Sequence, residues 1–308
     1  MLKYFAKRLL ILIPIILVVS FIVFAMMSMT GDPARMLAGD TMTEEQIDAL
    51  RESMGLNRPL IVRYFEYVGK ALRGDFGESL YGKNVWQEYI SRLPYTAILA
   101  VAAMFLVVVI SIPLGIVAAL KRGTLVDASV SALAVIGLSI PGFWLGLILM
   151  LAFSLGLGWL PTGGANTVSS IILPAVTAAV PNIALVTRTT RSSMLDALSM
   201  DFLRTARAKG ISENKVVFKH ALKNALIPII TIVGSQFSIL LGGTLVVEMV
   251  FSWPGVGYLI VTAVRGNDYN MVTGCVIMTT ILVALVLLLV DMLYAFVDPR
   301  IKAQYSRK

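Results

Sequence analysis

Long apolar runs dominate this chain and limit what it can fold into. A bilayer core of about 30 Å needs roughly 20 apolar residues in a helix. Hydrophobic residues make up 57% of the 308 residues and charged residues only 14%, against about 25% charged in soluble domains. The sequence therefore predicts an all-α integral membrane protein with six transmembrane helices, at Leu9–Met29, Ala97–Leu120, Val130–Leu155, Ser169–Thr187, Leu226–Val247 and Val272–Phe296.

In two of the predicted spans, prolines indicate a kink. Ser169–Thr187 carries Pro174 and Pro181, and Val130–Leu155 carries Pro141. Proline frees a backbone carbonyl, which neighbouring helices can satisfy inside a membrane bundle. We therefore expect both spans to be kinked and to lie within the bundle.

The basic residues indicate the orientation in the membrane. With six spans both termini lie on one side, and that side carries 17 of the 26 lysines and arginines, eight of them in the 188–225 loop. The other nine include eight in the long 30–96 loop, where ten acidic residues accompany them. The positive-inside rule then predicts that both termini and the 188–225 loop are cytoplasmic. The net charge of +8 is thus a topology signal, and no nucleic-acid partner is expected.

The 30–96 loop has helical patterns of its own. Thr43 and Gln46 are spaced as a capping box, which predicts a helix that ends at Gly55. Pro59 is expected to open a second helix, with one apolar face made of Ile61, Tyr64, Phe65, Val68 and Leu72. The loop is either a cover over the bundle or a contact surface for an external partner, and the two roles are compatible. We divide the chain into residues 1–94, the first span with this helical loop, and residues 95–308, a five-helix core with a loop at about 190–225.

Catalytic and metal-binding patterns are not evident. The chain has one cysteine and one histidine, and it lacks the G-x-x-x-x-G-K-[ST] phosphate loop. We therefore expect no enzyme activity, no metal and no bound cofactor. An intramembrane acid is a functional candidate. Asp291 lies near the inner end of the last span and pairs with basic groups or serves a pathway, whereas Glu248 faces a water-filled path or pairs with Arg265.

A basic insert at Asp201–Pro228 interrupts the apolar sequence. Asp201 is expected to cap a helix that stops at Gly210, and Ser212 to cap a second helix that Pro228 ends. Small side chains such as Ala206 allow close backbone approach to a partner. The insert is either a lever that docks on a protein or a basic amphipathic surface that rests on anionic lipid.

A family resemblance decides between these alternatives. R-T-A-x-x-x-G at Arg204–Gly210 and HALKNALIP at His220–Pro228 resemble the EAA loop of ABC importer permeases, in the dipeptide/oligopeptide/nickel family. The general motif starts with glutamate and two alanines, so only Ala206 and Gly210 match it. Further stretches similar to the family's signatures follow in order: GDP at 31–33, GLNRP at 55–59, GDFGESL at 74–80, LP at 160–161, EMVFSWPGVG at 248–257 and DMLYAFVDPR at 291–300.

The resemblance implies a type I importer (MetI-like) permease in a bacterial inner membrane. The implied partners are a homologous second permease, two ATP-binding subunits that hold ATP and magnesium, and an extracytoplasmic binding protein. The insert would couple to the ATPases through Arg204, Thr205, Ala206, Arg207, Lys209, Gly210, His220 and Asn224, and ATP binding would drive alternating access.

The cargo is expected to be di- or oligopeptides. Nickel, a metallophore or glutathione is the alternative within the family. A non-transporting membrane scaffold is the alternative of another class.

Overall fold

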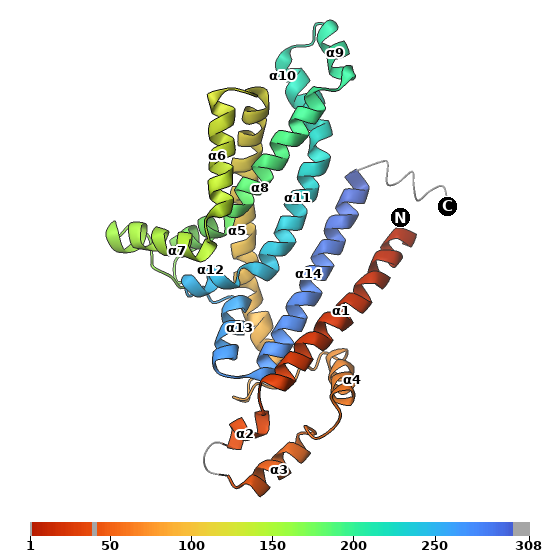
Figure 1. Cartoon of the computed structure of the whole chain (residues 1–308), viewed down its shortest axis with the longest axis vertical. Coiled ribbons are helices and arrows are strands. Elements are labelled where there is room, and N and C mark those ends of the chain that lie inside the picture. The colour runs from red at the N-terminus through yellow and green to blue at the C-terminus, as the bar shows by residue number, and fades with distance from the viewer. Residues whose placement is uncertain (1, 39–41, 298–308) are drawn as a thin grey trace.

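A computed structural model describes residues 2–38 and 42–297, and all regular elements over these residues are helical (Figure 1). The N-terminal part, with the long helix that follows it, contains α1 (Leu2–Thr30), α2 (Pro33–Ala38), α3 (Glu44–Ser53), α4 (Leu60–Ala71) and α5 (Val85–Leu120). The rest contains α6 (Leu125–Ser139), α7 (Gly142–Leu149), η1 (Met150–Gly156), η2 (Val168–Ile171), α8 (Ile172–Leu198), α9 (Asp201–Ala208), α10 (Glu213–Lys215), η3 (Val216–Ala221), α11 (Leu222–Gly243), α12 (Leu245–Val250), α13 (Val256–Arg265) and α14 (Tyr269–Val297).

The predicted membrane helices are present. Five helical runs are long and apolar enough to cross a bilayer, and the pair α6 and α7 makes a sixth if it is counted as one span. α8 is the central helix and packs against α5, α6 and α11, whereas α1 lies at the edge beside α14 (Figure 1). At one close crossing, a Cβ on Gly115 of α5 would lie 2.5 Å from Thr190 Cβ of α8. The expected division at residues 94 and 95 stays a prediction, although α5 runs through it.

The third predicted span is broken rather than kinked. α6 ends at Ser139 and α7 starts at Gly142, with a bend of 100° between them. Pro141 explains the break, because a proline disfavours helical geometry in the residue before it, and Ile140 is extended with φ −78 and ψ 122. α7 consequently runs across the bundle and not along it (Figure 1).

α8 continues beyond the predicted span Ser169–Thr187 to Leu198. The predicted helix end at Pro228 in the basic insert is wrong. Glu213–Gly243 is one continuous helical run that passes through Pro228, so the second helix of the insert is the start of the fifth span. The run includes a π-helical segment at Val216–Ala221, and Pro228 is tolerated because helices in a membrane bundle can absorb a missing backbone hydrogen bond.

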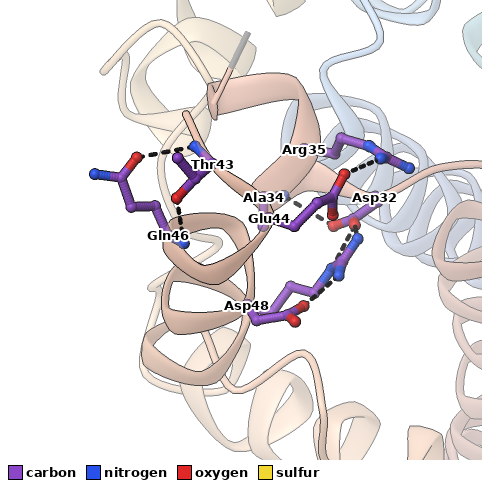
Figure 2. A network of polar contacts seen from close by, with 8 residues as sticks. Asp32, Ala34, Arg35, Thr43, Glu44, Gln46 and Asp48 are labelled. Atoms are coloured by element: carbon purple, nitrogen blue, oxygen red, sulfur yellow. Dashed lines mark hydrogen bonds and ion pairs between the residues drawn. The ribbon is translucent and has the colours of Figure 1, made fainter. Parts of the chain in front are cut away.

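The loop after α1 folds into a small helical module (Figure 2). The predicted capping box is confirmed, since Thr43 and Gln46 each accept a hydrogen bond from the other's backbone amide. Asp32 accepts hydrogen bonds from the Ala34 amide at 3.1 Å and from Arg51 Nε at 2.6 Å. Arg51 thereby fastens α3 to the end of α1.

The predicted apolar face of α4 is divided in the structure. Tyr64 is buried against α1, whereas Ile61, Phe65 and Leu72 are exposed. The helical period correctly groups apolar residues but does not tell which of them meet α1. Pro59 precedes the helix as expected, and Gly74 follows it with φ +83.

Candidate functional site

Two residues separate the central helix from the basic insert. α8 ends at Leu198 and α9 begins at Asp201. Met200 occupies the N-cap position, so the expectation that Asp201 caps the helix is wrong; Asp201 is the first helical residue. Gly210 ends the turn after α9 with φ +75, a conformation that L side chains rarely adopt. Ser212 takes the N-cap position of α10, although its side chain makes no cap hydrogen bond.

The insert has its own apolar core. Leu203 and Ala206 of α9 pack with Val216 and Val217, and Met194 of α8 joins the same cluster. Ala206 was expected to offer its small side chain to a partner, but here it lies inside the insert. Its size therefore serves the packing of α9 on the helix that follows.

The outer face of the insert is basic and carries exposed aromatic side chains. Arg204, Thr205, Lys209 and Gly210 are exposed. Arg207 is joined to Glu213 by hydrogen bonds of 2.7 and 3.0 Å, which connect α9 to α10. The Glu213 carboxylate also raises the pKa of the Arg207 guanidinium, so the pair stays ionised.

Sequence reasoning missed two exposed aromatic residues of the insert. Phe218 is 57% exposed and Phe202 is 42% exposed. Val216 and Val217, which directly precede Phe218, are buried, so the aromatic ring leaves the apolar core that the two valines join. Exposed aromatic side chains among basic residues are typical of a surface that binds another protein, and this composition was the available signal.

His220 and Asn224 lie one turn apart on the helical run that enters the membrane. The Asn224 side-chain amide donates to the His220 carbonyl at 2.9 Å. His220 is half-buried and Asn224 is exposed. They therefore line the membrane-proximal part of the insert rather than α9.

An ion pair joins two spans at the end of the bundle that carries the insert. Arg191 of α8 donates to both carboxylate oxygens of Asp127 of α6, at 2.5 and 2.8 Å. The Gly123 amide donates to the same carboxylate at 3.0 Å. Asp127 is only 6% exposed, so this pair is part of the packing between α6 and α8.

Glu248 is the centre of a buried polar junction. The Thr96 and Thr244 hydroxyls donate to its carboxylate at 2.7 and 2.9 Å, and the Tyr258 amide donates at 3.0 Å. A Cβ on Gly255 would lie 2.5 Å from this carboxylate. Glu248 is thus fully buried and ties α5 to α12 and α13, with these groups and not Arg265 as its partners. Its role in a pathway stays a prediction.

Three of the sequence signatures make contacts at the end of the bundle far from the insert. Gly31 lets the end of α1 reach α14, because a Cβ on it would lie 1.9 Å from the Tyr269 hydroxyl. Ser79 donates to the buried carboxylate of Asp268. The Gly164 amide donates to the Phe251 carbonyl at 2.8 Å. These stretches thus act as contacts between segments that are distant in the sequence.

Asp291, the second acidic candidate, is half-buried in α14. Its predicted role as a pathway or pairing residue stays a prediction. Among residues 2–38 and 42–297, the structure contains no group of three or more His, Cys, Asp or Glu side chains placed to hold a metal ion.

Comparison with known proteins identifies the family. Residues 111–303 match the model of the binding-protein-dependent transport system inner membrane component, and residues 1–100 match its N-terminal model. The chain is 44% identical over 304 residues to the glutathione transport system permease protein GsiC of Salmonella typhimurium (strain LT2), covering 98% of this chain and 99% of the relative. The identity to GsiC of Escherichia coli (strain K12) is 43% with the same coverage.

A solved structure supports the fold. A chain of the MetNI methionine ABC transporter in an inward-facing conformation matches with a TM-score of 0.59 at 20% identity, covering 68% of this chain and 96% of that chain. The helical bundle, the insert and the sequence signatures agree with these matches. The chain belongs to the binding-protein-dependent transport system inner membrane component family and is the permease subunit of an ABC importer.

Proposed function

We propose that this permease imports glutathione or a short peptide of closely similar chemistry. The observation that carries the proposal is the identity of 43% and 44% to glutathione permeases over nearly the full length of both chains. Glutathione is itself a tripeptide, so this cargo narrows the expected class of di- and oligopeptides. Nickel and metallophores are the less supported alternative.

The insert is the proposed contact with the ATP-binding subunits. Its exposed side chains combine positive charge at Arg204 and Lys209 with the aromatic rings of Phe202 and Phe218. The chain lacks a phosphate loop of its own, so the energy for transport comes from partners. Movement of α9 would reach the bundle through α8 and produce alternating access.

The proposed assembly has four further subunits. A homologous second permease forms a heterodimer with this chain, two ATPases bind the inserts on the cytoplasmic side, and a binding protein delivers cargo outside. Both termini lie in the cytoplasm of a bacterium, because the basic residues concentrate on that side.

Reconstitution tests the cargo. The complete importer is placed in liposomes with its binding protein, and uptake of labelled glutathione is measured with ATP on the ATPase side. We expect uptake that stops when the binding protein is omitted or when the ATPases cannot hydrolyse ATP. Competition with unlabelled dipeptides, tripeptides and nickel then ranks the cargoes. Uptake of dipeptide or nickel without uptake of glutathione would contradict the proposal.

A further inference from the structure

We propose that α4 is embedded in the bilayer leaflet at the end of the bundle opposite the insert. There it contacts lipid acyl chains through Ile61, Val62 and Phe65. The helix belongs to the 30–96 loop, which the sequence places in the aqueous phase outside the membrane. Three observations favour lipid instead: the depth of its contacts with α1, the direction in which it runs, and the composition of its uncovered face.

The first observation is the depth at which α4 contacts α1. The Tyr64 hydroxyl donates to the Leu17 carbonyl at 2.7 Å and lies 2.7 Å from Ser20 Oγ. Leu17 lies near the middle of the apolar segment Leu9–Met29. It is twelve residues before Met29, about 18 Å along the axis at a rise of about 1.5 Å per residue, whereas half of the hydrocarbon core is about 15 Å thick. Even with tilt, this contact lies well inside the membrane.

The aromatic contacts show how α4 lies on α1. The Tyr64 and Phe21 ring centroids are 5.1 Å apart, and those of Tyr67 and Phe24 are 5.6 Å apart. Later residues of α4 thus meet later residues of α1, so the two helices run in the same direction. The start of α4, which carries Ile61 and Val62, is therefore the end nearest the membrane centre.

The uncovered face of α4 is apolar where it is deepest. Ile61 is 59% exposed, Val62 41% and Phe65 64%. These side chains point away from α1, because Tyr64 and Tyr67 occupy the face that meets it. On α1 itself, Val18 and Ile22 are also exposed at the same depth. Apolar side chains that are uncovered at this level are solvated by hydrocarbon.

The charged residues of α4 are arranged for the headgroup region. Arg63 lies over the Phe24 ring at 5.8 Å, nearer the end of α1 than the Tyr64 contact. Arg58 pairs with Glu66 at 2.5 Å, and Lys70 follows one turn later. Long basic side chains can extend from a buried backbone to the interface. The helix therefore has one face for α1, one for lipid and one for the membrane surface.

Spin labelling measures this depth directly. Cys275 is the chain's one cysteine, so Cys275→Ala provides a background for single labels. Nitroxides are placed at Phe65 on the proposed lipid face and at Glu66, the next residue on the polar side. Ile22→Cys on α1 is the membrane control and Glu45→Cys on α3 the aqueous control, both at exposed positions. The complete importer is studied in lipid nanodiscs with oxygen and a water-soluble nickel chelate as relaxing agents.

The expected result is an oxygen-to-nickel accessibility ratio at Phe65 that matches Ile22 and exceeds Glu45 severalfold, with Glu66 in between. A ratio at Phe65 equal to that at Glu45 would place the face in water and overturn the proposal. Shielding of Phe65 from both agents would show that a protein covers it, which also overturns the assignment to lipid. The measurement needs no transport, so its outcome is independent of the proposed cargo.

Discussion

Arg191 holds Asp127 through two parallel hydrogen bonds, of 2.5 and 2.8 Å, and so joins α8 to α6. α8 also leads into the insert, whereas α6 leads through the break at Pro141 into α7. A displacement of α8 at this end is therefore shared with α6. The pair therefore connects the proposed coupling surface, through α8 and α6, to α7, which runs across the bundle.

Asp127→Asn tests this connection. The substitution leaves Arg191 without a carboxylate, and we expect a loss of about 1–3 kcal/mol, since removing one partner of a buried polar pair costs this much or more. Thermal unfolding in detergent measures the loss. Arg122→Gln is the matched control, because it removes an exposed positive charge close by. Equal melting temperatures for the two variants would contradict a structural role for the pair.

Gly31→Ala should disturb the contact between α1 and α14. The new Cβ would lie 1.9 Å from the Tyr269 hydroxyl, whereas a Cβ on Gly69 of α4 meets no atom within 4 Å. We expect Gly31→Ala to lower the melting temperature by several degrees and Gly69→Ala to be neutral or slightly stabilising. Adding Tyr269→Phe removes the nearest atom and should restore part of the loss. An unchanged melting temperature for Gly31→Ala would disprove the close contact.

Gly210→Asp should uncouple ATP hydrolysis from uptake. Gly210 has φ +75, and a Cβ there meets no atom of the chain within 4 Å. A loss of function larger than backbone strain explains would therefore arise at a partner surface. Gly82, in the loop between α4 and α5, has φ +71 and equally open surroundings. Gly82→Asp therefore carries the same strain outside the insert. We expect a large loss of uptake for Gly210→Asp alone, with ATPase activity that no longer responds to the binding protein. If both variants lost uptake equally, backbone strain alone would explain the effect and Gly210 would have no specific role at a partner surface.

Acid should weaken the contact between α3 and the end of α1 that Asp32 and Arg51 form. Burial raises the pKa of Asp32, but the hydrogen bonds and charge of Arg51 and the amides of Arg35 and Ala34 outweigh it, so the folded pKa is below the ordinary value. The stabilisation is complete above the unfolded pKa of about 4 and is lost as the pH falls through the folded pKa. Hydrogen exchange of α3 amides, corrected for intrinsic rates, should accelerate in that range. In the Asp32→Asn variant, the α3 amides should already exchange fast at neutral pH. Slow exchange in this variant would contradict the role of Asp32.

The orientation can be tested by labelling in intact cells. In the Cys275→Ala background, an impermeant thiol reagent should label a cysteine at Lys83 and not one at Ser212 until the membrane is permeabilised. Both positions are exposed, and neither side chain forms a helix cap. In bacteria with an outer membrane, the reagent must be small enough to pass it. The reverse pattern would invert the proposed topology.

The sequence predicts the membrane helices well because the bilayer imposes a length and a composition that hydropathy reveals. The capping box at Thr43 and the turn at Gly210 are also predictable, since each depends on local chemistry. Family signatures predicted the importer permease, and membership in the family excludes the alternative of a non-transporting scaffold.

Helix ends and side-chain environments were harder to predict because they depend on tertiary contacts. Pro141 breaks a span and Pro228 does not, although both follow apolar residues. The partners of Glu248 could not be predicted, because Thr96, which donates to it, lies 152 positions earlier in the sequence. Ala206 was assigned to a partner surface because a small residue has no preferred side from sequence alone.

The joint between α8 and α9 consists of Ser199 and Met200 alone. Two residues can extend over at most about 7 Å, so this joint has very little slack. Under the proposed coupling, a displacement of α9 by the ATPases is therefore passed on to α8 almost from its start. A longer joint, made by inserting two glycines, would let the ATPases hydrolyse ATP while the membrane helices stayed still.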